Sequence, residues 1–238
     1  MASRALTFGE RTYNISYEII NPNSQISALI LHGWGANKEL MMGAFKKMAL
    51  RQIYVDLPGF GNSDISVPLR TSDYAKIIEI FLREIKCEPK IIIGHSFGGK
   101  VATLLNPQIL VLLSSAGILE EKPASVKIKI KIYKALKSLG LGKFWRFFAS
   151  NDVNKLSPVM YETMKNVVDE DFSEIFGAFK NRALIFWGKA DSATHLKSGE
   201  KIHSLIANSQ FYALEGDHFF FLKNADFISE QISLNLEV

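Results

Sequence analysis

The sequence predicts an α/β fold: a mostly parallel, doubly wound sheet of about eight strands with helices on both faces. Short apolar runs rich in β-branched residues recur along the chain, and amphipathic helical patterns separate them. Such runs are typical of strands covered on both faces, and their alternation with helices indicates parallel strands joined by right-handed crossovers. The length of 238 residues and the 47% share of apolar residues suffice for one large core.

The apolar runs place the elements along the chain. Residues 12–20 alternate loosely and predict an antiparallel edge strand. A helix is expected at 71–85, where six apolar side chains form one stripe and residues 71–73 offer capping side chains. A second helix is expected at 196–206. The predicted buried strands are 26–31, 53–55, 90–93, 109–113 and 183–187, and a further short strand is expected at 210–214.

Residues 117–179 interrupt this rhythm. They are rich in lysine and aromatic residues and contain no clear strand. The segment 126–132 alternates apolar residues with lysines, but it also fits a helical stripe, and the length of the region favours helices. We therefore expect a core formed by residues 1–116 and 180–238, with a helical cap formed by 117–179.

Composition narrows the function classes. A net charge of +4 is too weak to indicate a nucleic-acid partner. Cys87 is the only cysteine, which excludes an internal disulfide and a thiolate metal cluster. The first residues do not resemble a secretory signal, and no run reaches about 18 apolar residues. We expect a cytoplasmic protein with no membrane span.

The charge is unevenly distributed. Between residues 120 and 150, eight basic residues oppose only Glu120 and Glu121, a local charge of +6 that leaves −2 for the rest of the chain. A solvated lysine face accounts for this cluster most simply, and steering of an anionic substrate or acidic carrier is the alternative. The eight are Lys122, Lys127, Lys129, Lys131, Lys134, Lys137, Lys143 and Arg146.

The strongest motif is Gly-His-Ser-Phe-Gly-Gly at residues 94–99, directly after an apolar run and before a helical pattern. A serine flanked by glycines two positions away, between a strand and a helix, is the nucleophile-elbow pattern. The turn is so tight that side chains at Gly94 and Gly98 would collide with neighbouring backbone. Ser96 is therefore the predicted nucleophile.

A serine hydroxyl needs a general base, and the base needs an acid to orient it. Elbow enzymes carry the acid and then the histidine after the serine. His218 follows the last predicted strand and is the predicted base. Asp191 follows the strand at 183–187, at an edge where parallel sheets place functional groups, and is the predicted acid. Asp217 is the rival, but it adjoins the histidine.

A second glycine-rich loop, His-Gly-Trp-Gly at residues 32–35, follows another apolar strand. Glycines allow backbone N–H groups to approach a developing oxyanion closely. We expect the N–H groups of Trp34 and Phe97 to form the oxyanion hole. His32 is expected to pin its own loop. No nucleotide-binding pattern or cluster of metal ligands is found, so neither a cofactor nor a metal is expected.

Five motifs of the chain, taken in sequence order, together resemble those of the α/β-hydrolase superfamily, and the match spans residues 28–238. The resemblance implies the α/β-hydrolase fold, the Ser96, Asp191 and His218 triad, and a helical cap after the sixth strand, where 117–179 falls. The motifs are His32-Gly33-Trp34-Gly35, Asp56-Leu57-Pro58-Gly59-Phe60-Gly61-Asn62-Ser63, residues 94–99, Trp187-Gly188-Lys189-Ala190-Asp191 and Gly216-Asp217-His218.

The resemblance leaves the substrate open. The first hypothesis is a hydrolase of small carboxylic esters. The second is a carbon–carbon bond hydrolase for 2-hydroxy-6-oxo-dienoates. Those enzymes often have Trp after the catalytic His, where this chain has Phe219, and a cap arginine, for which Arg146 and Arg182 are loose candidates. The third is a carrier-protein methyl ester esterase. A non-catalytic ligand receptor is the alternative from another class.

The partner is expected to be a small molecule, with an anionic or carrier-bound one as the special case. The tentative pocket residues are aromatic side chains of the cap and of the catalytic loops. They are His32, Trp34, Phe144, Trp145, Phe148 and Phe219.

Overall fold

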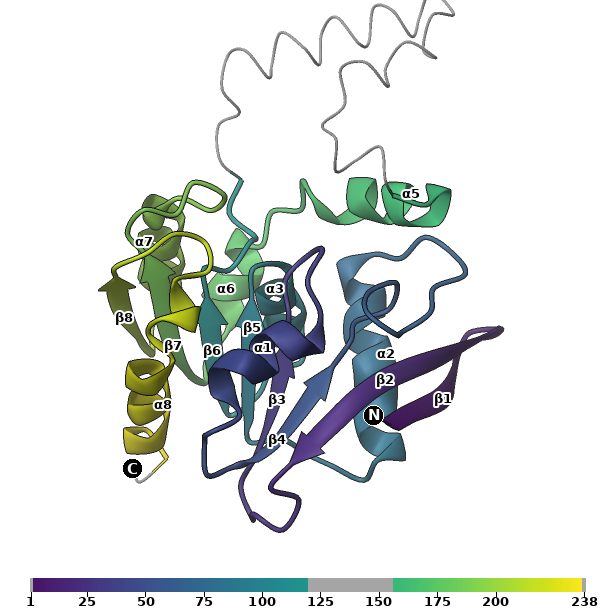
Figure 1. Ribbon diagram of the computed structural model, residues 1–238. Helices are drawn as coiled ribbons and strands as arrows, with labels where there is room; N and C mark the ends of the chain where they lie inside the picture. Colours follow the sequence, from purple (N-terminus) through teal and green to yellow (C-terminus); the bar gives the residue numbers. More distant parts are fainter. Residues whose placement is uncertain (1, 120–155, 237–238) are drawn as a thin grey trace, which may run out of the picture.

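A computed structural model of the chain describes residues 2–119 and 156–236, and these form an eight-stranded sheet with helices on both faces (Figure 1). The strand order is β1-β2-β4-β3-β5-β6-β7-β8. The strands are β1 (Ala2–Phe8), β2 (Arg11–Ile20), β3 (Ser27–Leu31), β4 (Arg51–Val55), β5 (Ile91–His95), β6 (Ile109–Leu113), β7 (Arg182–Gly188) and β8 (Ser209–Leu214).

Strands β3 to β8 are parallel to one another, and β2 runs antiparallel to both of its neighbours. The mostly parallel α/β sheet predicted from the sequence is thus confirmed. Every residue of β3, β5 and β6 is buried, because helices cover both faces of the sheet there. This double coverage explains why the central strands carry uninterrupted Ile, Leu and Val rather than an alternating pattern.

The position of β2 differs from the prediction. The strand is antiparallel as expected, but it is not the edge of the sheet, because β1 pairs with it from Ala2 opposite Tyr17 to Phe8 opposite Arg11. In β1 only Leu6 is fully buried. An edge strand with one buried side chain leaves no hydrophobic pattern by which the sequence could reveal it.

The helices form two layers, one on each face of the sheet (Figure 1). One layer packs on the apolar cluster that includes Tyr74, Val101 and Ile202, and the other packs on the cluster that includes Phe45 and Ile228. The first layer contains α2 (Thr71–Glu84), α3 (Phe97–Leu104), α6 (Ser173–Ala178) and α7 (Leu196–Leu205). The second contains α1 (Lys38–Phe45), the 3-10 turn η3 (Phe220–Leu222) and α8 (Ala225–Leu234).

Helix α2 ends within one residue of the predicted range. Its apolar stripe is buried against the sheet, and the Asp73 side chain accepts a hydrogen bond of 2.8 Å from the Arg70 N–H at the start of the helix. Thr71 does not cap the helix; its hydroxyl donates instead to Glu170, almost a hundred residues later. The predicted helix at 196–206 corresponds to α7.

The predicted cap, residues 117–179, is described only in part. Helix α5 (Pro158–Val167) begins after Ser157, whose hydroxyl accepts a hydrogen bond of 3.3 Å from the Met160 N–H. It lies above α2 (Figure 1), where Thr163 and Asn166 form hydrogen bonds with the backbone of Leu69. Helix α6 packs beside α3 and α7 in the first layer. The segment 126–132 and the basic cluster lie outside the described residues.

Among the described residues, no helix is both long enough and apolar enough to cross a membrane.

Candidate active site

Ser96 occupies a sharp turn between β5 and α3. Its backbone has φ 49° and ψ −114°, a region that a non-glycine residue occupies only when its surroundings hold it there. A Cβ atom on Gly94 would lie 2.4 Å from the Gly98 carbonyl oxygen, and one on Gly98 would lie 2.5 Å from the His32 carbonyl oxygen. The flanking glycines are therefore sterically required, as the motif predicts.

Hydrogen bonds from neighbouring segments hold the turn. The Ser96 N–H donates to the Leu113 carbonyl at the end of β6, at 3.0 Å. The Ser96 carbonyl accepts from the Ala116 N–H, also at 3.0 Å, and from the Gly99 N–H in the first turn of α3. The strained conformation is thus tied to β6 as well as to its own helix.

The loop of residues 32–35 lies directly on this turn. A Cβ atom on Gly33 would be only 3.1 Å from the Ser96 Cβ. Within residues 2–119 and 156–236, the N–H groups of Trp34 and Phe97 have no backbone acceptor. Phe97 is also the first residue of α3, where the helix dipole favours negative charge. Both groups are therefore available to an oxyanion near Ser96.

His32 supports the loop from behind. It is fully buried, its Nδ1 lies 2.7 Å from the Gly33 carbonyl oxygen, and its Nε2 accepts a hydrogen bond of 3.0 Å from the Leu57 N–H. Burial lowers the pKa of His32, so the ring is neutral. Its proton lies on Nδ1, because the Gly33 carbonyl oxygen beside that nitrogen can only accept a hydrogen bond. With both nitrogens engaged by backbone, His32 holds the loop and does not line the pocket.

Asp56 organises the adjoining loop of residues 56–63. Its carboxylate accepts hydrogen bonds from the Asn62 N–H at 3.0 Å and from the buried Lys38 ammonium at 2.6 Å. A Cβ atom on Gly61 would lie 2.3 Å from the carboxyl carbon. The sequence does not reveal Lys38, which lies eighteen residues before its partner. This loop packs against the loop of residues 32–35, since the ring centres of Phe60 and Trp34 lie 4.9 Å apart.

Asp191 and His218 form a partly buried pair in the loops that follow β7 and β8. Asp191 Oδ2 lies 2.8 Å from His218 Nδ1, and the Asp191 side chain is fully shielded from solvent while that of His218 is 18% exposed. A carboxylate can only accept a hydrogen bond, so His218 carries a proton on Nδ1. In the neutral ring, Nε2 is consequently the basic nitrogen.

Thr194 completes the surroundings of Asp191. Its N–H and its hydroxyl donate to the two carboxylate oxygens, both at 3.0 Å, and the Ala193 N–H adds a third hydrogen bond at 2.8 Å. Burial by itself would raise the pKa of Asp191, but hydrogen bonds from His218, Thr194 and Ser114 outweigh it and lower the pKa to about 2. The carboxylate therefore stays ionised beside the imidazole.

A pocket of about 590 Å³ opens at Ser96. Apolar and aromatic side chains line it together with polar and charged groups. The apolar side chains are Trp34, Phe97, Ile118, Leu119, Met164, Val167 and Val168. The polar ones are Ser96, Lys100, Asp169, Glu170, Ser192, Thr194 and His195.

Lys100 lies in this pocket one helical turn after Ser96. It is 2% exposed, and its ammonium donates to the Val167 carbonyl oxygen at 2.6 Å and to the Glu170 carboxylate at 2.7 Å. The ammonium also lies 4.8 Å from the centre of the Phe172 ring. Lys100 thus joins the helix that follows Ser96 to the end of α5.

Several predicted site residues can be placed and others cannot. Trp34 lines the pocket, whereas Phe219 does not; it is 43% exposed, and its ring centre lies 5.6 Å from that of His218. Phe144, Trp145 and Phe148 lie outside the described residues.

Sequence reasoning misses Thr194 and Lys100. The first has a local signal, because a threonine three residues after an aspartate can donate back to it. Lys100 has a weaker sequence signal, because it is a single charged residue inside the apolar helix that follows Ser96.

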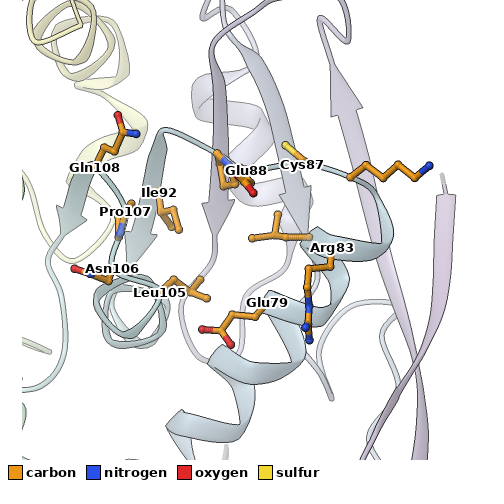
Figure 2. A pocket seen from close by; sticks show the side chains of 12 residues that line it. Glu79, Arg83, Cys87, Glu88, Ile92, Leu105, Asn106, Pro107 and Gln108 are labelled. Carbon is orange, nitrogen blue, oxygen red and sulfur yellow. The ribbon is translucent and has the colours of Figure 1, made fainter.

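A larger hollow, of about 920 Å³, lies at the opposite edge of the sheet, where β5 and β6 begin. Figure 2 shows Glu79 and Arg83 of α2 on one side of it and the loop Leu105–Gln108 on the other. None of the predicted catalytic residues lines it. In the described parts of the chain, no group of three or more His, Cys, Asp or Glu residues is arranged to hold a metal ion.

Comparison with known proteins agrees with this geometry. The sequence pattern of the Alpha/beta hydrolase family matches residues 28–229, which is most of the chain. The chain belongs to the alpha/beta hydrolase family. The match includes Ser96, Asp191 and His218 and the loop of residues 32–35.

Two relatives illustrate the range of similarity. The "Uncharacterized hydrolase YugF" of Bacillus subtilis (strain 168) is 25% identical over 269 residues, covering 92% of this chain and 93% of that protein. The "Pimeloyl-[acyl-carrier protein] methyl ester esterase" of Aeromonas salmonicida (strain A449) is 44% identical over 85 residues, covering 32% of this chain and 30% of that protein.

Solved structures support the fold. An esterase from Exiguobacterium antarcticum superimposes with a TM-score of 0.74 at 22% identity, covering 95% of this chain and 96% of that one. A meta-cleavage product hydrolase from Pseudomonas fluorescens IP01 has a TM-score of 0.68 at 18% identity, with 92% and 93% covered. Because both kinds of enzyme share the fold, the fold alone does not choose between their reactions.

Proposed function

We propose that this hydrolase cleaves small carboxylic esters through an acyl-enzyme on Ser96. The observation that carries the proposal is the Asp191–His218 pair, 2.8 Å between Oδ2 and Nδ1. Thr194, which donates to Asp191, lines the same pocket as Ser96, the serine held in a strained elbow. Ser96 is the nucleophile, His218 the general base and Asp191 the group that orients it. The Trp34 and Phe97 N–H groups stabilise the oxyanion.

The reaction follows from the proton positions. With Nδ1–H donated to Asp191, His218 Nε2 accepts the Ser96 hydroxyl proton while Oγ attacks the ester carbonyl. The carbonyl oxygen becomes an oxyanion that the two N–H groups bind. The alcohol then leaves with the proton from Nε2, and water, activated by the same nitrogen, releases the acid. Asp191 remains ionised throughout, in keeping with its low pKa.

The described pocket favours a neutral acyl group of modest size. Its volume of about 590 Å³ is in the range of small-molecule sites, and its apolar wall suits a short alkyl or ring. Its charged lining comprises Lys100 against Asp169 and Glu170, so it carries no excess of positive charge for an anionic acyl group.

Active-site labelling tests the nucleophile. A fluorophosphonate probe should modify the wild-type protein and the Ser96→Ala variant should remain unlabelled. The Ser204→Ala variant is the matched control, because Ser204 is an exposed serine of α7 whose hydroxyl donates to the Lys201 carbonyl oxygen of the same helix. A folded wild-type protein that resists the probe would contradict the enzyme proposal and favour a ligand receptor.

A substrate panel tests the reaction. p-Nitrophenyl esters of graded acyl length should be hydrolysed faster than a 2-hydroxy-6-oxo-dienoate, with the rate falling once the acyl group exceeds the pocket. Faster turnover of the dienoate than of every ester would favour the carbon–carbon bond hydrolase instead.

A carrier-bound methyl ester is the second candidate substrate, because the Aeromonas salmonicida relative with that name is 44% identical over 85 residues. The decisive comparison is between a methyl ester attached to an acyl carrier protein and the same acyl group as a free methyl ester. A strong preference for the carrier-bound form would assign this substrate. Equal rates would leave small esters as the substrate class.

A further inference from the structure

His95 precedes the nucleophile, and the mechanism above gives it no role. It is 1% exposed at the end of β5, and its ring is surrounded by three others: those of His218 at 4.6 Å, Phe221 at 4.8 Å and Phe219 at 5.6 Å between centres. The side chain therefore points from the elbow strand into the loop that carries the base.

The protonation of His95 follows from its contacts. Nε2 lies 3.0 Å from the His218 carbonyl oxygen, which can only accept, so the proton resides on Nε2. Burial, and then the neighbouring His218 charge, lower the pKa of His95 to about 3, so the ring stays neutral near pH 7. Nδ1 has no hydrogen-bond partner among the described residues.

That unpaired nitrogen faces the oxyanion loop. A Cβ atom on Gly33 would lie 2.8 Å from His95 Nδ1, so the glycine backbone packs closely against it. Buried polar atoms without hydrogen-bond partners are rare in proteins, so an unpaired ring nitrogen calls for an explanation. One explanation is that the other nitrogen of the same ring has a role that keeps the histidine in place. Here the other side of the ring is the hydrogen bond to His218.

Other described contacts of the His218 loop lead to the end of β7 and to Asn224, directly before α8, whose side chain donates to the Glu215 carbonyl at 3.0 Å. The Gly216 carbonyl accepts from the Ala190 N–H at 2.9 Å, and the Asp217 carbonyl lies so close to Gly188 that a Cβ there would be 2.3 Å from it. Among hydrogen bonds of the described residues, the one from His95 joins this loop directly to the strand that leads into Ser96.

We propose that His95 is a positioning residue for His218: its Nε2–H, donated to the His218 carbonyl, sets the position of the general base relative to the nucleophile elbow. The inference rests on the proposed function, in which His218 is the base. Asp191 orients the imidazole ring about its own axis, whereas His95 places the backbone from which that ring projects. A base displaced by about 1 Å costs roughly 100-fold in rate.

The test compares two substitutions. His95→Phe keeps a ring among Phe219 and Phe221 but removes the donor, whereas His95→Gln keeps an N–H donor near the position of Nε2. For p-nitrophenyl acetate hydrolysis, we expect His95→Phe to lower kcat by roughly 100-fold with little change in KM. His95→Gln should recover most of the loss. Phe45→Leu is the packing control, since Phe45 is buried and stacks on the far side of Phe221.

A readout independent of turnover separates this inference from the proposed function. The Nδ1 proton of His218, bonded to Asp191, should give a downfield NMR resonance that weakens or moves upfield in His95→Phe and persists in His95→Gln and Phe45→Leu. An unaltered resonance and an unaltered kcat in His95→Phe would overturn the inference. A wild-type protein inactive on every ester would overturn the proposed function, and the NMR comparison would still decide the role of His95.

Discussion

Replacing Asp191 with Asn removes a buried negative charge while keeping the size of the side chain. The amide of Asn presents an N–H group where the carboxylate presents an acceptor, so it favours the wrong tautomer of His218. We expect kcat for p-nitrophenyl acetate to fall by about 10,000-fold. The control is Asp226→Asn, an aspartate in the first turn of α8.

The same substitution has a predicted effect on stability. The pKa of Asp191 is lowered from 3.8 to about 2, a difference that corresponds to about 2 kcal/mol of stability near pH 7. Because the folded-state pKa is the lower one, this contribution is present above about pH 4 and disappears as the pH falls through about 2. Urea unfolding at pH 7 and pH 3 should show a larger gap between wild type and Asp191→Asn at pH 7. Equal unfolding free energies at pH 7, or activity within tenfold of wild type, would refute the reasoning.

Three further substitutions probe other parts of the site. Gly98→Ala places a Cβ 2.5 Å from the His32 carbonyl oxygen, so urea unfolding should show a free energy of unfolding lower by roughly 1–3 kcal/mol. The fluorophosphonate probe should also label Ser96 more slowly. An unchanged urea midpoint would contradict this prediction. Thr194→Val removes a donor to Asp191, so the acid limb of the pH–stability curve should move upward in pH; a coincident curve would count against this role. Lys100→Met removes the donor to the Val167 carbonyl and the Glu170 carboxylate, so the free energy of unfolding should fall by about 1–3 kcal/mol. The KM should rise as well. Wild-type values for both quantities would show that the Lys100 contacts contribute nothing.

The central sheet was predictable because buried parallel strands leave a strong pattern. The runs that became β3, β5, β6 and β7 contain little but Ile, Leu, Val, Ala and aromatic residues, and their ends are correct to within two residues. Strand β1 was not predictable, since six of its seven residues keep some exposure and its pairing with β2 depends on backbone hydrogen bonds that any sequence can form.

The site divides in the same way. The positions of Ser96, Asp191 and His218 could be inferred because a tight turn requires glycines and because the edge of a parallel sheet collects functional groups. The supporting contacts could not be inferred. Thr71 and Glu170 are almost a hundred residues apart, and the same carboxylate receives the Lys100 ammonium seventy residues away. Only the folded chain brings such partners together, and their residue types are ordinary on a solvated surface.

Helix α3 connects Ser96 to the wall of the pocket beside it. Ser96 directly precedes the helix, and Lys100, one turn later, donates to the last residue of α5, Val167. Opening α5 away from the pocket would therefore strip a buried ammonium of one of its acceptors, which is a costly step. We therefore expect the amides of α5 near Val167 and those of α3 to show similar protection in a hydrogen-exchange experiment. The size of the pocket at Ser96 thus depends on a buried ammonium that α3 itself carries.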